Sequence, residues 1–561
     1  MPRLPPTSRR PRQAAASVTP SPARIKLQPS QLQLLLALNL TSSVFCDWEG
    51  GYARVKCNQD GMVTELSSRF SFFSRPDVPA DITALSALQK LDLSFNRFGG
   101  SLEILGQFPE LQYVDLSHTD FRGSIPETIS NAKSLQYLNL QGLKLSGSLP
   151  GSISRLTALQ SLHIGIESDD RFPYKYLNGH LDPIDPLSIQ PYLHFPVMQG
   201  SVDDLSCLAP LTRLQNLALM SLNLTAGDLP FSLSALTSLK HLDLSFLPIT
   251  RLPQWIASLT RLTHLDVTGK LHVHRSASFP TKWIALTRLE TLRAGLNGFT
   301  GSIPSTISAL TVLTILDLYG NNISGSIPAG ISELPRLHAL DLSHNQLTSM
   351  PSTLNWGGHF SMAHNQLQGP LPSALVSTDF VTLELQGNAF SGSLPNFALW
   401  KYPYLEILDV SDNQLSGSLP DSITRLALLY RLGLGGNNLS GVIPASLGGL
   451  TDLSYLNVSG TGLTCPANGS KCLVKQSNTT GFCRLCFSFC ASCTPLALSV
   501  PTEDPAWPAP VTDAPMWVTK ETAWPAPQAR SASGPRMRIY ASIDHSTAAA
   551  VAAILLLVLG M

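Results

Sequence analysis

The residues whose spacing most directly suggests chemistry are two pairs of cysteines near the carboxyl end of the chain. Cys483 and Cys486 form the first C-x2-C pair, and Cys490 and Cys493 form the second. Thiolates at this spacing can bind zinc or an iron–sulfur cluster. Only three residues separate the pairs, which is short for two halves of one zinc site, and the run misses the ferredoxin spacing. We therefore expect disulfides here and no metal centre.

The other cysteines support a chain that folds in an oxidising compartment. Cys465 and Cys472 join the carboxyl-terminal cluster, Cys46 and Cys57 lie near the amino end, and Cys207 stands alone. Cysteines gathered at both ends of a regular region are typical of disulfide-closed caps. N-x-Ser/Thr glycosylation sequons agree with this compartment; they begin at Asn39, Asn223, Asn322, Asn438, Asn457, Asn468 and Asn478.

Motifs for catalysis and for nucleic-acid binding are missing. The sequence has no G-x-S-x-G, H-E-x-x-H or G-x4-G-K-[ST] motif. His272 and His274 have a metal-like spacing but no carboxylate or cysteine nearby. The 38 basic and 38 acidic side chains balance, without the basic excess of nucleic-acid-binding proteins. We expect a protein that is not an enzyme, holds no cofactor and does not bind nucleic acid.

An internal repeat accounts for most of the chain. The segments LQKLDLSFN, LTILDLYGN, LHALDLSHN, LEILDVSDN and LYRLGLGGN align without gaps and close at Asn96, Asn321, Asn345, Asn413 and Asn437. Weaker copies, three of them closing at Asn297, Asn365 and Asn388, bring the number to about fifteen, most of them 23 to 25 residues apart. A period of this length predicts a solenoid in which each copy forms one coil.

Each copy contains the pattern L-x-L-x-x-N, which predicts a short strand followed by a turn. The two leucines point to the interior because side chains alternate along a strand. The asparagine is expected to turn inward and bond the backbone of neighbouring coils, since buried amides need partners. The outward slot between the leucines is often aspartate, and we interpret this column as structural: Asp92, Asp115, Asp243, Asp266, Asp317, Asp341 and Asp409.

After the strand, nine copies read G-x-[IL]-P, as in GSIPETI and GSLPDSI. Glycine permits a turn with positive φ, and proline cannot extend a sheet. This signature resembles plant-type extracellular leucine-rich repeats, found in receptor-like kinases, receptor-like proteins and polygalacturonase inhibitors. The resemblance covers residues 66–464, although RLPQWI and SMPSTL depart from it. It implies an α/β leucine-rich-repeat solenoid, a curved right-handed superhelix with a parallel sheet on its concave face and short 3-10 or irregular segments on its convex face.

The amino-terminal region allows more than one interpretation. Residues 1–30 are a basic Pro/Arg-rich leader, and residues 31–65 resemble the amino-terminal cap of plant-type proteins, with Cys46, Trp48, Gly50 and Cys57 at matching places. The resemblance implies a cap helix and a disulfide between the two cysteines. Residues 32–40 also fit the apolar region of a secretory signal, and the leader's lack of acids fits an organellar transit peptide. The sequence does not decide among them.

Three segments follow the repeats. Residues 465–500 are a Cys-rich cap, and residues 501–546 are a Pro-rich stalk. Residues 547–561 are an apolar tail that is short for a spanning helix. With Ser531 and Ser533 as small attachment residues upstream, the tail fits a GPI-anchor signal. A short tail anchor and a plain apolar terminus are the alternatives.

Outward positions of the strands are the candidate ligand-binding residues, because aromatic, imidazole and arginine side chains often dominate interfaces. The candidates are Tyr113, Tyr137, His241, His264, Tyr319, His344, Tyr430 and Arg431. Residues 168–208 interrupt the repeat and add Tyr174 and Tyr176. Long inserts in regular folds are often functional, and this one resembles in placement the island of some plant receptor ectodomains. A degenerate repeat is the alternative.

These features predict a cell-surface or cell-wall protein on the extracellular side of the plasma membrane. We expect it to bind a protein, peptide or glycan on the concave face and to signal, if at all, through a co-receptor. Its carboxyl-terminal anchor would attach it to the membrane. The alternative is a structural or adhesion protein of the matrix, or an inhibitor of secreted hydrolases.

Overall fold

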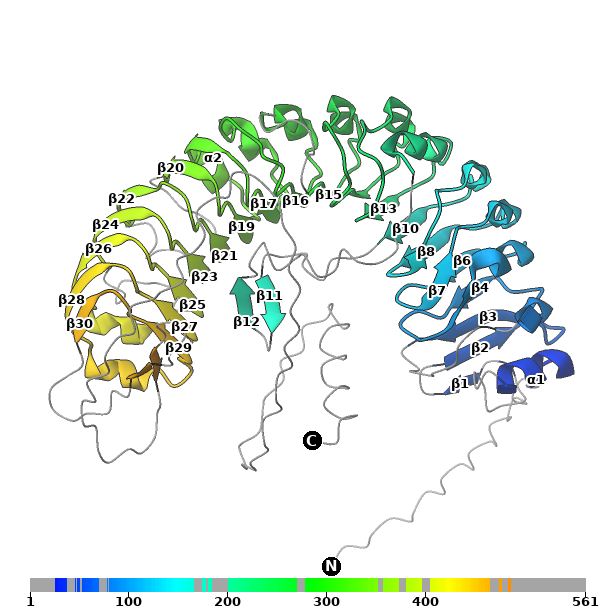
Figure 1. The fold of residues 1–561 in the computed structure, drawn as a ribbon, viewed down its shortest axis with the longest axis horizontal. Helices are drawn as coiled ribbons and strands as arrows, with labels where there is room; N and C mark the ends of the chain where they lie inside the picture. The colour runs from blue at the N-terminus through cyan, green and yellow to red at the C-terminus, as the bar shows by residue number, and fades with distance from the viewer. Residues whose placement is uncertain are drawn as a thin grey trace, which may run out of the picture. The chain divides into compact units, whose positions relative to one another are not determined.

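The repeats form a solenoid that stacks coil by coil, as predicted. The computed structural model describes residues 26–37, 46, 48–50, 53–69, 78, 80–165, 174–177, 180–183, 200–269, 278–351, 357–372, 380–395, 404–464, 474–476 and 483–485. All of them belong to the first of two compact units, Met1–Cys493. Within this unit the strands of the main sheet line the concave side of the stack, and the short helices lie on the convex side (Figure 1).

Every predicted copy contributes one strand to a single parallel ladder. Each strand pairs with the strand of the next coil, because each coil turns back to the same starting point. The ladder begins at β3 (Val63–Ser68) and then runs through β4 (Lys90–Asp92), β6 (Tyr113–Asp115), β8 (Tyr137–Gln141), β10 (Ser161–Gly165), β13 (Asn216–Met220), β14 (His241–Asp243), β15 (His264–Asp266), β16 (Thr291–Arg293), β17 (Ile315–Asp317), β19 (Ala339–Asp341), β21 (Gly358–Ser361), β23 (Phe380–Glu384), β25 (Ile407–Asp409), β27 (Arg431–Gly433) and β29 (Tyr455–Asn457).

The leucines of the strand pattern form one continuous core. For example, Leu91 in β4 is fully buried and Leu93, directly after β4, is 1% exposed, and both pack against the equivalent apolar residues of adjacent coils. No coil could bury this edge alone, so stacking supplies the hydrophobic stabilisation.

Apart from the turns Leu102–Gln107 and Val202–Leu208, which begin after serine, most of the described convex turns begin after a proline that ends the extended part of the coil. Its fixed φ suits the residue that precedes a helix, as at Pro126 (φ −76°) and Pro304 (φ −72°). RLPQWI departs from the plant-type signature but forms the same kind of turn, η8. The turns are η1 (Ala80–Ala84), η2 (Leu102–Gln107), η3 (Glu127–Asn131), η4 (Gly151–Arg155), η6 (Val202–Leu208), η7 (Phe231–Ala235), η8 (Gln254–Ser258), η9 (Thr281–Ala285), η10 (Ser305–Ala309), α2 (Ala329–Ser332), η13 (Asp421–Arg425) and η14 (Ala445–Gly449).

Additional short sheets follow the main strands, and the sequence did not predict them. They form where the residues after the asparagine are extended and pair with the same segment of the next coil. Glycine ends many of these segments with positive φ, as predicted (Gly417, +85°). The strands are β5 (Gly99–Ser101), β7 (Asp120–Gly123) and β9 (Lys144–Leu145); β18 (Ser324–Ser326) and β20 (Gln346–Ser349); and β22 (Gln368–Pro370), β24 (Ala389–Ser393), β26 (Gln414–Gly417), β28 (Asn438–Val442) and β30 (Gly462–Thr464).

The closing asparagines turn inward and join neighbouring coils, which confirms their predicted role. Asn321 Nδ2 donates to the carbonyl of Leu318 in its own turn (2.8 Å) and to that of Ala294 in the preceding coil (3.0 Å). Asn321 Oδ1 accepts from the backbone N–H groups of Asn297 (3.1 Å) and Phe299 (3.0 Å). One buried amide side chain therefore satisfies four backbone groups that the turns leave without partners.

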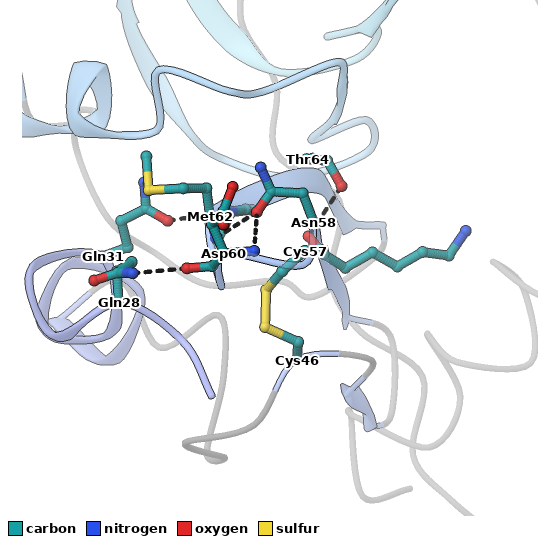
Figure 2. The surroundings of a disulfide bond; sticks show 10 residues. Gln28, Gln31, Cys46, Cys57, Asn58, Asp60, Met62 and Thr64 are labelled. Atoms are coloured by element: carbon teal, nitrogen blue, oxygen red, sulfur yellow. Dashed lines mark hydrogen bonds between the residues drawn. A yellow bond between two sulfur atoms is a disulfide. The ribbon is translucent and has the colours of Figure 1, made fainter. Parts of the chain in front are cut away.

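The amino-terminal cap is closed by the expected disulfide between Cys46 and Cys57 (Figure 2). Strands β1 (Trp48–Gly50), β2 (Ala53–Cys57) and β3 form an antiparallel meander. Residues Pro29–Ala37 form helix α1, which places Leu35 in the core and ties Gln31 to the Val63 N–H (2.9 Å). Whether this segment also serves as a signal stays a prediction.

At the carboxyl end the backbone of β31 (Val474–Gln476) and β32 (Cys483–Leu485) forms an antiparallel hairpin that reaches β29. The side chains of the Cys-rich cap, the stalk, the apolar tail and residues Ser531 and Ser533 lie outside the described residues. None of the helices in the described ranges is long and apolar enough to cross a bilayer.

A candidate ligand-binding surface on the concave sheet

The pairing register arranges the outward side chains in rows across the sheet. The first row contains the residue before the first inward leucine of each strand, including Lys90, Tyr113, Tyr137, His241, His264, His359, Arg431 and Tyr455. The second row contains the residue between the leucines, including Asp92, Asp115, His163, Asp266, Arg293, Asp317, Asp341, Ser361, Glu384 and Asp409. Neighbouring members of a row lie on adjacent strands, about 4.8 Å apart.

Two candidate tyrosines form an aromatic stack on this surface. The rings of Tyr113 and Tyr137 are 4.3 Å apart at 4°, and His163 tilts against Tyr137 at 5.6 Å. The Lys90 ammonium lies 4.7 Å from the centre of the Tyr113 ring on the adjacent coil. Burial raises the pKa of Tyr113 and of Tyr137, so both phenols remain neutral and can donate hydrogen bonds.

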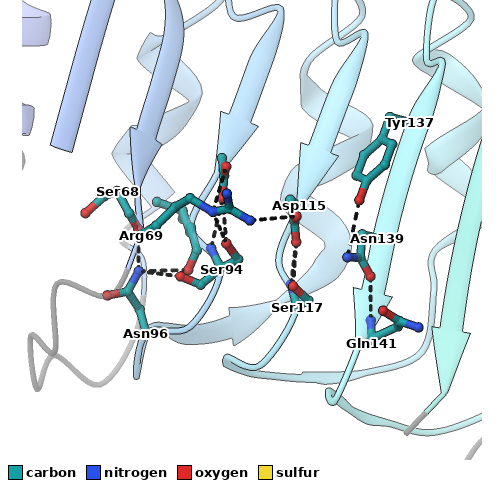
Figure 3. Close-up of polar contacts among 11 residues, drawn as sticks. Ser68, Arg69, Ser94, Asn96, Asp115, Ser117, Tyr137, Asn139 and Gln141 are labelled. Atoms are coloured by element: carbon teal, nitrogen blue, oxygen red, sulfur yellow. Dashed lines mark hydrogen bonds and ion pairs between the residues drawn. The ribbon is translucent and has the colours of Figure 1, made fainter. Parts of the chain in front are cut away.

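An arginine beside this stack neutralises two second-row carboxylates (Figure 3). Arg69 Nε lies 3.4 Å from Asp92 Oδ2, and its Nη2 lies 3.9 Å from Asp115 Oδ2. The same Nε donates to the Ser94 hydroxyl at 3.0 Å. The two aspartates are 3% and 2% exposed, so Arg69 compensates charge that would be costly to bury alone.

The aspartate column is structural, as interpreted from the sequence. Asp115 Oδ1 accepts from the N–H (3.0 Å) and hydroxyl (2.6 Å) of Ser117, two residues further on. Asp341 makes the same pair of bonds with Ser343 (2.8 and 2.6 Å). Each aspartate thus caps the turn that leaves its own strand.

Two histidines of the first row stack in the middle of the sheet. The His241 and His264 rings are 4.1 Å apart at 11°. Burial lowers the pKa of both imidazoles, and the neighbouring His241 lowers the pKa of His264 further. The pair is therefore neutral near pH 7.

A further row follows the strands, where the backbone is left-handed. His344 (φ +54°) and His364 (φ +52°) stack here at 4.4 Å, and Phe95 stacks on His118 at 4.5 Å. The backbone of a non-glycine residue with positive φ is strained, and such strain is often found at functional positions. The coil after His364 contains Gly387. Any larger residue at this position would place its Cβ 2.5 Å from Nδ1 of the His364 imidazole. Glycine therefore provides the space in which the histidine ring lies.

The carboxyl-terminal part of the sheet presents Arg431. Its Nη2 lies 3.4 Å from Asp409 Oδ2, and its guanidinium lies 4.5 Å from the centre of the Tyr455 ring. Burial raises the pKa of Tyr455 to about 12. Tyr430 precedes the strand, is half-buried, and belongs to neither row.

Tyr319 was predicted at an outward, ligand-binding position, but the structure buries it. It is only 8% exposed, because its ring occupies the space that a side chain at Gly295 would fill. Tyr174 and Tyr176 lie in the hairpin of β11 (Tyr174–Leu177) and β12 (His180–Pro183), and their side chains lie outside what the structure describes, as do His272 and His274.

Three surface residues were missed by sequence reasoning: Arg69, Lys90 and Tyr455. Lys90 and Tyr455 occupy the same position in the repeat as Tyr113, so an alignment of the repeat copies could have identified both as surface residues. Arg69 follows the cap strand β3 and precedes the first L-x-L-x-x-N copy, so nothing in that pattern marks it.

The glycosylation sequons differ in how far the structure describes them. Three of the asparagines are exposed: Asn223, Asn322 and Asn438. Asn457 Oδ1 accepts a hydrogen bond from the Ser459 N–H at 3.0 Å, and Asn39, Asn468 and Asn478 lie outside the described residues. Cys207 is a half-buried free thiol in η6, and burial raises its pKa to about 11. Among the described residues no cluster of three His, Cys, Asp or Glu side chains could hold a metal ion.

Comparison with known proteins agrees with the fold. A leucine rich repeat model matches residues 287–347 and 403–463, and a second one matches 87–108, 110–132 and 134–156. No curated protein sequence matches the chain.

The chain is also similar to solved structures. One is a TDR receptor, with 29% identity and a TM-score of 0.57 over 72% of this chain and 64% of that one, so the chain spans less than two thirds of it. A second is the Arabidopsis receptor kinase HAESA in complex with the peptide hormone IDA and the co-receptor SERK1 (25% identity, TM-score 0.52, 77% and 80% covered). A third is the Leptospira interrogans LRR protein LIC12759 (28%, 0.51, 71% and 90%).

Proposed function

Because the chain is a leucine-rich-repeat protein similar to plant receptor ectodomains, we propose that it is a non-enzymatic extracellular protein that captures a peptide on its concave sheet. The binding surface comprises Lys90, Tyr113, Tyr137 and His163, with Arg69 beside them. The stack of Tyr113 on Tyr137 is the observation that carries the proposal.

Ring geometry favours a peptide over a glycan. Sugars bind aromatic side chains through the flat face of the ring. In this stack Tyr113 and Tyr137 cover one face of each other, while Lys90 and His163 lie over the outer sides. The ring edges and hydroxyl groups are what remain for a ligand. Neutral phenols can donate to and accept from the amides of an extended peptide.

The relatives supply independent support for a peptide and a co-receptor. The HAESA structure contains a peptide hormone and a co-receptor, on a fold that this chain shares over most of its length. By analogy, signalling by this chain would pass through a partner. The alternative role, adhesion or inhibition of a secreted hydrolase, predicts a protein ligand and a larger contact area.

Extracellular location is part of the proposal. The cap disulfide and the exposed sequon residues Asn223, Asn322 and Asn438 support it. Attachment through a GPI anchor at Ser531 or Ser533 is proposed from the sequence. Release of the protein from cells by phosphatidylinositol-specific phospholipase C is expected, and retention after treatment would exclude this anchor.

The proposed surface can be tested without knowing the natural ligand. A phage-displayed library of random dodecapeptides is selected on the secreted protein, and hydrogen–deuterium exchange then maps each selected peptide. We expect slower exchange in β6, β8 and β10. Protection confined to the convex turns η3 and η4 of the same coils would contradict the proposal.

A further inference from the structure

The second row of the sheet is a ladder of buried acids, and most of them lie next to an arginine of the same chain. Arg69 lies within 3.4 Å of Asp92 and 3.9 Å of Asp115. At the other end, Arg431 Nη2 lies 3.4 Å from Asp409 Oδ2. The sheet therefore compensates charge along this row with side chains placed between or beside the acids.

In the middle of the ladder the compensating residue is itself a member of the row. Arg293 pairs in register with Asp266 on one side and with Asp317 on the other. Its positive charge lowers the pKa of both carboxyl groups, against the stronger effect of burial. An arginine between two acids is thus an arrangement that this fold already accommodates.

Three strands beyond Arg293, the same arrangement of acids recurs with a small residue between them. Ser361 pairs in register with Asp341 and with Glu384, so it holds the place that Arg293 holds between Asp266 and Asp317. The residue two places after it is Ala363, which is also small. Asp341, Ser361 and Glu384 are 6%, 2% and 2% exposed.

One carboxylate oxygen at this place is buried without a hydrogen-bond partner. Asp341 Oδ1 is bonded to Ser343, but Asp341 Oδ2 has no partner in the described structure. Gln386 Oε1, two residues after the end of the next strand β23, is a second buried acceptor without a partner. Unsatisfied buried acceptors are costly, so two of them on either side of one strand indicate a place for an external donor.

We propose that this place, the Ser361 slot, takes the cationic side chain of an arginine or lysine of a bound peptide. The inference rests on the proposed function of the concave sheet and adds the charge of the ligand. A guanidinium offers five donors in a planar fork, which suits a carboxylate oxygen on one side and an amide oxygen on the other. A metal ion is a poorer occupant, because the described residues contain no set of three ligands.

The test uses N-acetyl-arginine methylamide as the probe and its citrulline analogue, which has the same shape without the charge. Thermal unfolding is followed at pH 8 for the wild type, Asp341→Asn and Asp115→Asn. Asparagine already caps the equivalent turns at Asn139 and Asn457, so both variants should fold. Asp115 is the matched control because Arg69 already serves it.

We expect the arginine probe near its dissociation constant to raise the unfolding midpoint of the wild type and of Asp115→Asn by about 1 °C, with no shift for Asp341→Asn. The citrulline analogue should shift none of them. Ser361→Arg supplies the cation within the chain and should abolish the response. A shift of equal size in Asp341→Asn, an equal effect of citrulline, or no shift in the wild type would overturn the inference. Such a result would not contradict peptide binding at Tyr113 and Tyr137, because the hydrogen–deuterium exchange experiment tests that proposal separately.

Discussion

Tyr113 and Tyr137 stack with their ring centres 4.3 Å apart and their planes at 4°, across two adjacent coils. The inter-strand spacing of about 4.8 Å imposes this contact on any two aromatic residues that share a row. The stack therefore fixes two rotamers in the absence of ligand. Little side-chain entropy remains to be lost when a peptide binds, which is the advantage of a preorganised surface.

Removing one hydroxyl from the stack should weaken peptide binding while leaving the rings in place. Tyr137→Phe keeps the aromatic contact with Tyr113 but loses the hydroxyl group that accepts from Asn139 and that we propose contacts the peptide. We expect a selected dodecapeptide to bind about 5- to 10-fold more weakly, the effect of one hydrogen bond. Titration calorimetry measures this change. Unchanged affinity would show that the phenol does not contact the peptide.

The asparagine network should dominate the stability of the middle coils. Asn321→Ala removes a side chain that satisfies backbone groups in two coils. We expect the free energy of unfolding to fall by about 2–4 kcal/mol, because several buried groups lose their partners at once. The neighbouring exposed Asn322→Ala serves as the control and should change it by less than about 0.5 kcal/mol. Equal effects in denaturant titrations would contradict this assignment.

The cap disulfide should stabilise the amino-terminal coils. The double variant Cys46→Ser/Cys57→Ser removes a bond between cysteines that are 11 residues apart in the sequence. We expect the free energy of unfolding to fall by about 2–4 kcal/mol. Thermal unfolding in parallel with Cys207→Ser, which removes the free thiol, isolates the effect of the bond. If Cys207→Ser lowered the midpoint as much as the double variant, the loss would not come from the disulfide.

The buried aspartates and the buried histidine should make stability depend on pH with opposite signs. Burial raises the pKa of Asp317 and Asp341 to about 7, so the folded state keeps protons that the unfolded chain has released. This contribution is lost progressively as pH rises from about 4 to 7. Burial lowers the pKa of His344 to about 4, so its contribution has the opposite sign and is lost as pH falls below about 6.5.

Unfolding free energies measured between pH 4 and 8 should separate the two effects when each variant is compared with the wild type. The difference between Asp341→Asn and the wild type should change between about pH 4 and 7 and level off above that range, and the difference for His344→Gln should change with the opposite sign between about pH 4 and 6.5. Parallel profiles of Asp341→Asn and the wild type from about pH 4 to 7 would be inconsistent with a buried, protonatable Asp341.

The features that all coils share could be predicted from the sequence, because they depend only on the repeat period and on residue type. The inward leucines, the bonds of Asn321 and the turn-capping role of Asp115 all follow from needs that every coil shares. The disulfide between Cys46 and Cys57 followed from resemblance to a known cap.

Features that depend on the neighbouring coil could not be read in the same way. Tyr319 is buried because the adjacent coil carries Gly295, and His364 fits its turn because the next coil carries Gly387. Arg69, which follows β3 and precedes the first L-x-L-x-x-N copy, reaches two aspartates. Such contacts depend on which side chains the strand register places next to each other. A consensus repeat pattern does not contain this information, because it describes every coil by the same residues.

Calorimetric titration of one selected dodecapeptide into Tyr113→Ala/Tyr137→Ala tests the central claim most directly. The control is Phe231→Ser, which changes a side chain 76% exposed on a convex turn. If the concave stack binds the peptide, the double variant should lose at least about 10-fold in affinity, as expected for aromatic hot spots, and the control should match the wild type. Equal affinity of the double variant and the wild type would place the binding surface elsewhere.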